Sequence, residues 1–290
     1  MKSTPRNWFI TGCDKGMGAA ICETLLAHGE RVFATALDPV NLDGLAARYP
    51  DTLWVHKLNV TKADEIAEAV ARAEQCTGGI DCLVNNAGYG ILGAAEETTP
   101  AEYRPMFEVN FFGMAEVTRA FLPHMRHRRR GHIFATSSSG GFAASPGFGF
   151  YAASKFALEG FCESVSLDVA ALGIKVTIME PGSFRTDFAG GSMVRPANPI
   201  DDYADTAVKL TVDRMKARHG TQPNDPRKFA LVLLILSRLP APPLRMPLGA
   251  DSIDRLRGKL AAVAAEFDRY EHLCRAVAFD SEYPLERDLE

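Results

Sequence analysis

The chain has 290 residues, of which 47% are hydrophobic and 23% charged, and its formal net charge is −4. This size and balance are typical of one large globular domain with a substantial core. A slightly acidic chain has no general attraction for nucleic acid or acidic membranes, which argues against both as partners. Its six cysteines lack the paired spacing of zinc sites or disulfide frameworks, so we expect reduced thiols in a cytoplasmic protein.

No part of the chain predicts an integral membrane segment. The longest aliphatic run, ALVLLIL at 230–236, is much shorter than the roughly 20 residues that a bilayer requires. We expect it to be a buried turn of helix. The start of the chain, MKSTPRNWFITGCDKG, lacks the long apolar region of a signal peptide.

Short apolar segments alternate with helical patterns as far as Gly182. The expected strands are 7–11, 31–37, 52–58, one within 80–88, 131–139 and 174–182. The expected helices are 18–29, 42–50, 62–76, about 102–128 and 150–173. This alternation predicts an α/β fold with a doubly wound parallel sheet of Rossmann type, in a single domain over 1–290.

The character of the chain changes after Gly182. Residues 183–202 are rich in Gly, Pro, Ser and Asn, and we expect a substrate-binding lid over about 183–228. Residues 201–220 read as a helix, and about 250–275 as a C-terminal helix. Between these two helices, PAPPLRMPLG (240–249) has too much proline for a helix interior but could supply an edge strand.

The first expected strand runs directly into TGCDKGMG (11–18), which opens a helix. Glycines allow a tight turn and a close backbone approach to a ligand. The helix that follows offers free N–H groups and a positive dipole end to a phosphate. This context favours a pyrophosphate cradle over a tight turn in a protein without ligand.

The stretch YAASKFALEG (151–160) places Tyr151 and Lys155 one helical turn apart on the same face. By themselves they could be a solvated surface pair. A nearby ammonium also lowers the pKa of a phenol, which is ordinarily about 10. The pair therefore has the chemistry of a tyrosine general acid or base.

These motifs together resemble the short-chain dehydrogenase/reductase family. The matching motifs, in chain order, are TGCDKGMG as TGxxxGxG, NNAG (85–88), Asn110 in EVNFFG, Ser138 in TSSSGG, YAASK as YxxxK, and PGSFRT (181–186) as PGxxxT. The resemblance covers residues 8–186 and thins beyond about 190. The helical C-terminal extension is similar to the retinol- and hydroxysteroid-dehydrogenase-like branch.

The resemblance implies an NAD(P)-dependent oxidoreductase that interconverts a secondary alcohol and a ketone or aldehyde. Tyr151 would be the general acid/base, Lys155 would hold the nicotinamide ribose, and Ser138 would polarise the carbonyl oxygen. Asn110 would hold a water linked to Lys155, although a helix residue that ties neighbouring loops together is the alternative. The cofactor-binding residues so implied are Gly12, Asp14, Lys15, Gly16, Met17, Gly18, Leu37, Asp38, Asn59, Val60, Asn86, Ala87, Gly88, Tyr151, Lys155, Pro181, Gly182, Phe184 and Thr186.

The choice between the two nicotinamide cofactors is finely balanced in the sequence. The position for a ribose-binding carboxylate at the end of the second strand is Ala36, and the next position, a frequent site of arginine, is Leu37. Lys15 could meet a 2′-phosphate, whereas Asp38 could oppose it or bind the ribose diol. We lean to NADP(H) over NAD(H), because Lys15 has no comparable alternative role.

Apolar residues are expected at the mouth of the site, which suits a bulky hydrophobic alcohol or carbonyl compound. They are Tyr89, Phe142, Phe148, Phe150, Phe184, Phe188 and Met193. Each of them could instead pack the domain. The histidines lack metal-ligand spacing, so no metal is expected, and the basic cluster HMRHRRRGH (124–132) is read as a helix end rather than a nucleic-acid site.

Two other functions remain compatible with these motifs. One is a catalytically silent sensor that binds a dinucleotide, and the other is an epimerase or dehydratase that uses a transient hydride step. Members of the family often form homodimers or homotetramers through the long helices expected here at about 102–128 and 150–173.

Overall fold

The computed structural model describes residues 4–279. The strands of its main sheet are β1 (Asn7–Thr11), β2 (Arg31–Ala36), β3 (Leu53–Lys57), β4 (Cys82–Asn85), β6 (Gly131–Thr136), β7 (Ile174–Pro181) and β9 (Arg245–Leu248). Within the described residues these seven strands form one parallel sheet in the order β3-β2-β1-β4-β6-β7-β9. The predicted doubly wound parallel sheet is confirmed.

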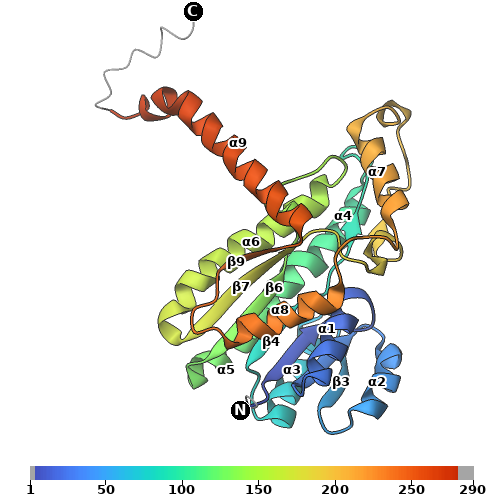
Figure 1. Cartoon of the computed structure of the whole chain (residues 1–290), viewed down its shortest axis with the longest axis vertical. Helices are drawn as coiled ribbons and strands as arrows, with labels where there is room; N and C mark the ends of the chain where they lie inside the picture. Colours follow the sequence, from blue (N-terminus) through green and yellow to red (C-terminus); the bar gives the residue numbers. More distant parts are fainter. Residues whose placement is uncertain (1–3, 280–290) are drawn as a thin grey trace, which may run out of the picture.

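Helices cover both faces of this sheet (Figure 1). The α-helices within residues 4–279 are α1 (Gly16–Ala27), α2 (Asp43–Arg48), α3 (Ala63–Thr77), α4 (Pro100–Phe107), α5 (Met114–Arg128), α6 (Gly149–Val169), α7 (Ala207–Arg218), α8 (Pro226–Arg238) and α9 (Ala250–Arg275). Helices α3, α5 and α6 supply one hydrophobic core, and α1 and α8 supply the other. The strand order reverses between β1 and β4, and ligands bind at such a point in open α/β sheets.

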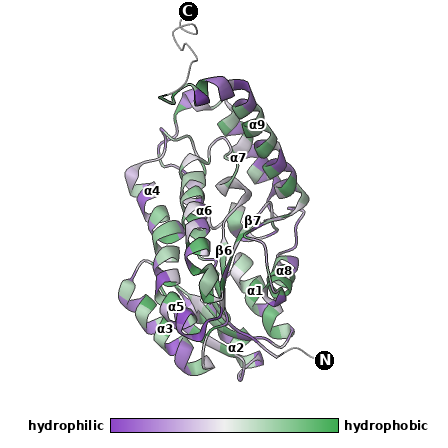
Figure 2. Ribbon diagram, turned by 90° about the vertical axis from the view of Figure 1, so that its left-hand side faces the viewer, coloured by the Kyte–Doolittle hydropathy of each residue, from purple (hydrophilic) through white to green (hydrophobic). Residues whose placement is uncertain are grey.

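Alternate residues of β1 feed the two cores. Phe9 stacks on Phe33 and meets Phe121 edge-on, with ring centres 5.4 and 4.7 Å apart. On the opposite face, the ring of Trp8 stacks on that of Phe134. Each fully buried side chain of this size contributes about 1.5–3 kcal/mol. Figure 2 shows the hydrophobic sides of the flanking helices turned toward the sheet. The two cores fix the strand ends that carry the site.

The helix expected over about 102–128 occurs as three consecutive pieces. It begins earlier than predicted, at Pro100, because Thr99 and Glu102 form a capping box. A π-helical turn, η2 (Glu108–Gly113), then separates α4 from α5. Such turns often occur at functional sites, and this one carries Asn110 in a buried position.

The region expected to be a lid contains more structure than its composition indicated. Its short strand β8 (Met193–Val194) pairs in parallel with β5 (Gly90–Ile91), which follows β4 in the chain. Two-residue strands leave no periodicity to detect. The region also contains α7, but α8 begins within its last residues and packs on α1 as part of the core.

The remaining C-terminal expectations are confirmed. The run 230–236 lies in α8, where Phe229, Leu233 and Leu236 are buried. The proline-rich segment supplies β9 at the edge of the sheet, where the missing N–H of Pro247 costs no ladder hydrogen bond. None of the helices within residues 4–279 is long and apolar enough to cross a membrane.

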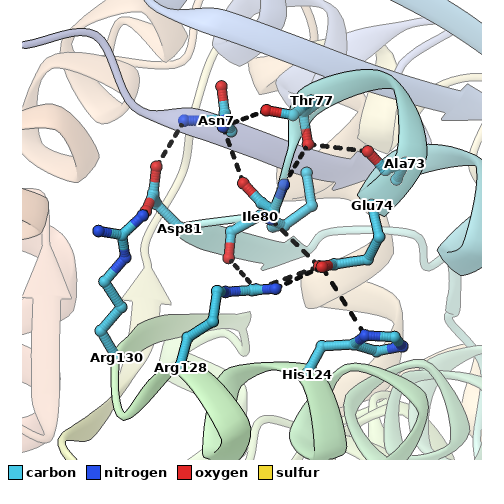
Figure 3. Close-up of polar contacts among 10 residues, drawn as sticks. Asn7, Ala73, Glu74, Thr77, Ile80, Asp81, His124, Arg128 and Arg130 are labelled. Atoms are coloured by element: carbon cyan, nitrogen blue, oxygen red, sulfur yellow. Dashed lines mark hydrogen bonds and ion pairs between the residues drawn. The ribbon is translucent and has the colours of Figure 1, made fainter.

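The basic cluster at the end of α5 pairs with carboxylates of the body (Figure 3). Arg128 forms a two-point ion pair with Glu74 of α3 and donates to the carbonyl oxygen of Ile80 at 2.9 Å. Arg130 lies 3.0 Å from Asp81. The cluster therefore joins the end of α5 to α3 and β4, which agrees with its interpretation as a helix end.

Candidate active site

The turn between β1 and α1 is shaped for an anion. Gly12 and Gly16 have φ of 70° and 59°, a left-handed conformation that favours glycine. A Cβ on Gly18 would overlap the carbonyl oxygen of Gly12, so the turn closes tightly. Lys15 precedes α1 without making a side-chain cap hydrogen bond. The first N–H groups of α1 therefore remain available, and they fit the pyrophosphate of a dinucleotide.

Asn86 ties this turn to the end of β4. Its Nδ2 donates to the carbonyl oxygens of Thr11 and Gly12, at 3.0 and 3.1 Å. In return, Oγ1 of Thr11 accepts from the backbone N–H groups of Asn86 and Ala87, at 2.9 and 3.0 Å. The glycine turn and the NNAG segment are thus held together as one rigid edge.

Ser138, Tyr151 and Lys155 line a single cavity. Tyr151 and Lys155 come from the first turns of α6, and both are buried, with 8% and 4% exposure. Nζ of Lys155 lies 6.0 Å from the centre of the Tyr151 ring and donates to the carbonyl oxygen of Thr136 at 2.8 Å. Oγ of Ser138, just after β6, accepts from the N–H of Gly140 at 3.0 Å.

Burial dominates the acid–base properties of this pair. It raises the pKa of Tyr151 to about 12, while Ser138 acts in the opposite direction. Burial also lowers the pKa of Lys155 to about 8, against the nearby Cys162 and Glu159. Lys155 was expected to lower the pKa of Tyr151, but in the protein by itself that pKa is raised, because desolvation of the phenolate outweighs an ammonium at this distance.

Asn110 has a structural role in this arrangement. Its Nδ2 donates to the carbonyl oxygen of Tyr89 at 2.9 Å and to Oγ of Ser154 at 3.1 Å. Its Oδ1 accepts from the N–H of Tyr89 at 3.0 Å. A Cβ on Gly88 would lie 2.9 Å from this Oδ1. Asn110 thus holds the 88–89 backbone against the π-helical turn, as in the alternative considered for it.

A pair of buried carboxyl groups lies behind the site. Oε1 of Glu159, one turn after Lys155, accepts from Oγ of Ser137 at 2.7 Å. Oε1 of Glu180, a fully buried residue of β7, lies 3.8 Å from Nε of Arg245. Neither oxygen of Glu180 has a hydrogen-bond partner within residues 4–279. Burial and the charge of Glu159 raise the pKa of Glu180 to about 8, so it holds a proton at neutral pH.

The cavity has a volume of about 640 Å³ and runs from the glycine turn past the tyrosine to the lid. Most of the predicted site residues line it. They are Gly12, Asp14, Lys15, Gly16, Met17, Leu37, Asn59, Val60, Asn86, Ala87, Gly88, Tyr89, Ser138, Phe148, Tyr151, Lys155, Pro181, Gly182, Phe184, Thr186 and Phe188.

Five predicted site residues besides Asn110 lie outside the lining, and four of them have other roles in the glycine turn, the lid and the loops. Gly18 is buried beneath the turn that it helps to close. Asp38 accepts from the N–H of Val40 at 3.2 Å and caps a short helical turn instead. Met193 is buried in β8, with its side chain against Gly90. Phe142 ends the 3₁₀ turn η3 (Ser139–Gly141) and is half-buried away from the cavity.

Phe150, the remaining aromatic candidate, also lies outside this cavity. Its ring stacks on Tyr103 with centres 4.1 Å apart, in a separate groove beside α4. The prediction that Phe142, Met193 and Phe150 line the substrate site is therefore wrong. The direction of a side chain in a loop or at the start of a helix depends on packing that composition does not reveal.

Three arginines at the cavity were missed. Arg214 and Arg218 lie one turn apart on α7, and neither has an ion-pair partner within the described residues. Their i, i+4 spacing in the helical part of the expected lid could have indicated them. Arg255 of α9 donates to the carbonyl oxygen of Ala143 and to Oγ of Ser145. No local signal marks Arg255, because β9 brings α9 to the site.

Metal ligands do not gather at this site. In the part of the chain that the structure describes, no group of three or more His, Cys, Asp or Glu residues could hold a metal ion. One further polar group points to a bound ligand, since the buried Oγ1 of Thr136, a cavity residue, has no hydrogen-bond partner within residues 4–279. With the free N–H groups of α1, the residues present fit a nicotinamide dinucleotide.

Comparison with known proteins agrees with this geometry. Residues 6–194 match the family model for short chain dehydrogenases. The chain is 35% identical over 262 residues to oxidoreductase BOA17 of Botryotinia fuckeliana, covering 90% of this chain and 94% of that protein. It is also 36% identical over 198 residues to human retinol dehydrogenase 8, covering 66% of this chain and 62% of that one.

A solved structure extends the similarity to nearly the whole fold. A short-chain dehydrogenase from Streptomyces avermitilis is 39% identical, with a TM-score of 0.89, covering 95% of this chain and all of that one. The glycine turn, the Ser138–Tyr151–Lys155 cavity and these relatives lead to one conclusion. The chain belongs to the short-chain dehydrogenase/reductase family of NAD(P)-dependent oxidoreductases.

Proposed function

We propose that this enzyme interconverts a secondary alcohol and a ketone or aldehyde on a hydrophobic substrate, with Tyr151 as general acid/base. The observation that carries the proposal is the shared cavity of Ser138, Tyr151 and Lys155, which continues to the glycine turn. A nicotinamide bound along this cavity would supply the hydride to the carbonyl carbon or accept it from the alcohol.

In the reductive direction, Ser138 donates a hydrogen bond to the substrate oxygen and stabilises the negative charge that develops there. Tyr151 transfers its phenolic proton to the same oxygen. Lys155, anchored on the carbonyl oxygen of Thr136, keeps an ammonium near the phenol and holds the ribose. A positive charge brought close to the ring opposes the effect of burial on the pKa of Tyr151, so proton transfer becomes easier in the loaded enzyme.

We propose NADP(H) as the preferred cofactor. Lys15 is exposed at the cavity and has no ion-pair partner within residues 4–279, so it is free to meet a 2′-phosphate. Asp38, the carboxylate that would compete, is held by the N–H of Val40. Leu37 lines the cavity, but its side chain cannot accept a hydrogen bond from a ribose hydroxyl as a carboxylate would.

The substrate is expected to be bulky and apolar. The rings of Phe148 and Phe188 each have their centre 5.8 Å from that of the Tyr151 ring. Tyr89 lines the same end of the cavity. Such aromatic walls with few polar groups suit steroid-like, retinoid-like or aryl compounds.

We also propose that the enzyme is cytoplasmic and assembles as a homodimer or homotetramer.

The test is the absorbance of NADPH and of NADH during incubation of the purified enzyme with a panel of hydrophobic ketones. We expect consumption of NADPH that depends on the ketone. Tight cofactor binding without turnover on any ketone would favour a sensor. Conversion of a substrate without net consumption of cofactor would favour an epimerase or dehydratase.

A further inference from the structure

Most of α9, here called the arm, projects from the body of the protein (Figure 1). Its buried residues, Ser252 and Leu256, belong to its first turns, and the helix then continues to Arg275. At 1.5 Å per residue, the 26 residues span about 39 Å. Helices in proteins take most of their stability from packing against other elements, so the projecting part of α9 calls for a partner surface.

An apolar stripe runs along this projecting helix. Its members alternate at spacings of three and four residues: Ile253, Leu256, Leu260, Val263, Phe267, Tyr270 and Cys274. Leu260, Phe267 and Tyr270 are 56%, 67% and 44% exposed, and Figure 2 shows hydrophobic residues along the arm. A mean spacing of 3.5 residues is the period of a helix that packs along another helix. The expected occupant is therefore a helix.

The charges beside the stripe indicate which helix would pack against it. Arg257 and Lys259 flank the stripe near the base of α9. Glu266 and Glu271 flank it nearer the tip, where Glu271 also pairs with Arg275 of the same helix at 2.7 Å. Two such arms running antiparallel place the basic base of each against the acidic tip of the other. Two parallel arms would bring Glu266 of one copy close to Glu271 of the other. The mixed charges also disfavour an anionic membrane, which selects for lysine and arginine.

We propose that α9 is a dimerisation arm that packs antiparallel against α9 of a second copy of this chain. The contact continues outward along the same stripe from Leu256, which is already packed on the body. It buries Leu260, Phe267 and Tyr270 of both copies. The 3.5-residue spacing thus indicates a helical partner. The opposite charges at the base and the tip of α9 indicate that this partner is α9 of a second copy.

Sedimentation equilibrium of the full chain tests the proposal. We expect Phe267→Glu to halve the molar mass of the assembly, because it places a charge in the stripe. Ala265→Glu adds the same charge at an exposed position off the stripe and should leave the mass unchanged. Since Phe267 is largely exposed, circular dichroism should show both variants folded like the wild type. A monomeric wild type, or an unchanged mass for Phe267→Glu, would overturn the proposal.

A charge exchange tests the antiparallel direction. Lys259→Glu should weaken the arm-to-arm association at least several-fold, and Lys259→Glu with Glu266→Lys should restore it. Glu266→Lys alone should weaken an antiparallel pair, because it then faces Lys259 of the other copy. If Glu266→Lys alone strengthens the association, the arms are parallel. If none of these changes alters the association, another surface holds the copies together.

Discussion

We predict that the buried carboxyl of Glu180 makes the free energy of unfolding depend on pH. Its side chain is fully buried, and Nε of Arg245 lies 3.8 Å from its Oε1. Burial, together with the charge of Glu159, raises its pKa from 4.5 to about 8. Between these two pH values the folded protein holds a proton that the unfolded chain has released. Since the folded state binds more protons in this window, stability falls as pH rises through it.

Glu180→Gln should remove this loss, because glutamine has nearly the shape of a protonated glutamate and has no proton to release. Each tenfold change in proton affinity corresponds to about 1.4 kcal/mol. The free energy of unfolding of the variant should therefore gain about 3–5 kcal/mol on the wild type between pH 4.5 and 8. At the acidic end of this window the two proteins should differ by less than about 1 kcal/mol.

Urea unfolding at several values of pH measures this difference. Glu163→Gln is the matched control, because Glu163 pairs with the same Arg245 but its side chain is half exposed. Its difference from the wild type should change little with pH, as for other surface ion pairs. If Glu180→Gln and the wild type keep a constant difference from pH 4.5 to 8, Glu180 is ionised in the folded protein and the reasoning fails.

Three further predictions follow from single contacts. Lys15→Ala should raise the KM for NADPH about tenfold and leave that for NADH nearly unchanged, since it removes one charge-assisted contact; equal changes in both would refute its proposed phosphate contact. Gly18→Ala should abolish NADPH binding in a fluorescence titration, because the new methyl group overlaps the Gly12 carbonyl oxygen; normal affinity would contradict the tight turn. Arg128→Ala should lower the free energy of unfolding in urea by about 1.5–3 kcal/mol, because it removes the two-point ion pair with the largely buried Glu74; an unchanged midpoint would show that the pair adds nothing.

The sequence predicted those parts of the site in which residues close together in the chain determine the geometry. Gly12 and Gly16 are required by the backbone of a strand-to-helix turn. Tyr151 and Lys155 are brought together by one turn of helix, and the strand alternation fixes the sheet that carries them. In these places a few neighbouring residues determine the geometry.

Local sequence patterns could not predict the contacts between elements that lie far apart in the chain. Arg255 reaches the cavity because β9 adds to the sheet edge. Glu180 lies under the influence of the Glu159 charge because α6 packs on β7. Phe148 lines the cavity whereas Phe142 and Phe150 do not, although all three lie in the same aromatic-rich segment. The pKa of Tyr151 rises rather than falls because its burial, which the sequence does not show, exceeds the influence of Lys155.

The central claim is that Tyr151 moves the proton at a carbonyl reduced in this cavity. The most direct measurement compares the wild type with Tyr151→Phe for both NADPH binding and turnover of the ketone preferred by the wild type. We predict that the variant binds NADPH with unchanged affinity and loses turnover by at least about a hundredfold, the range of a general acid. Undiminished turnover in Tyr151→Phe would contradict the account.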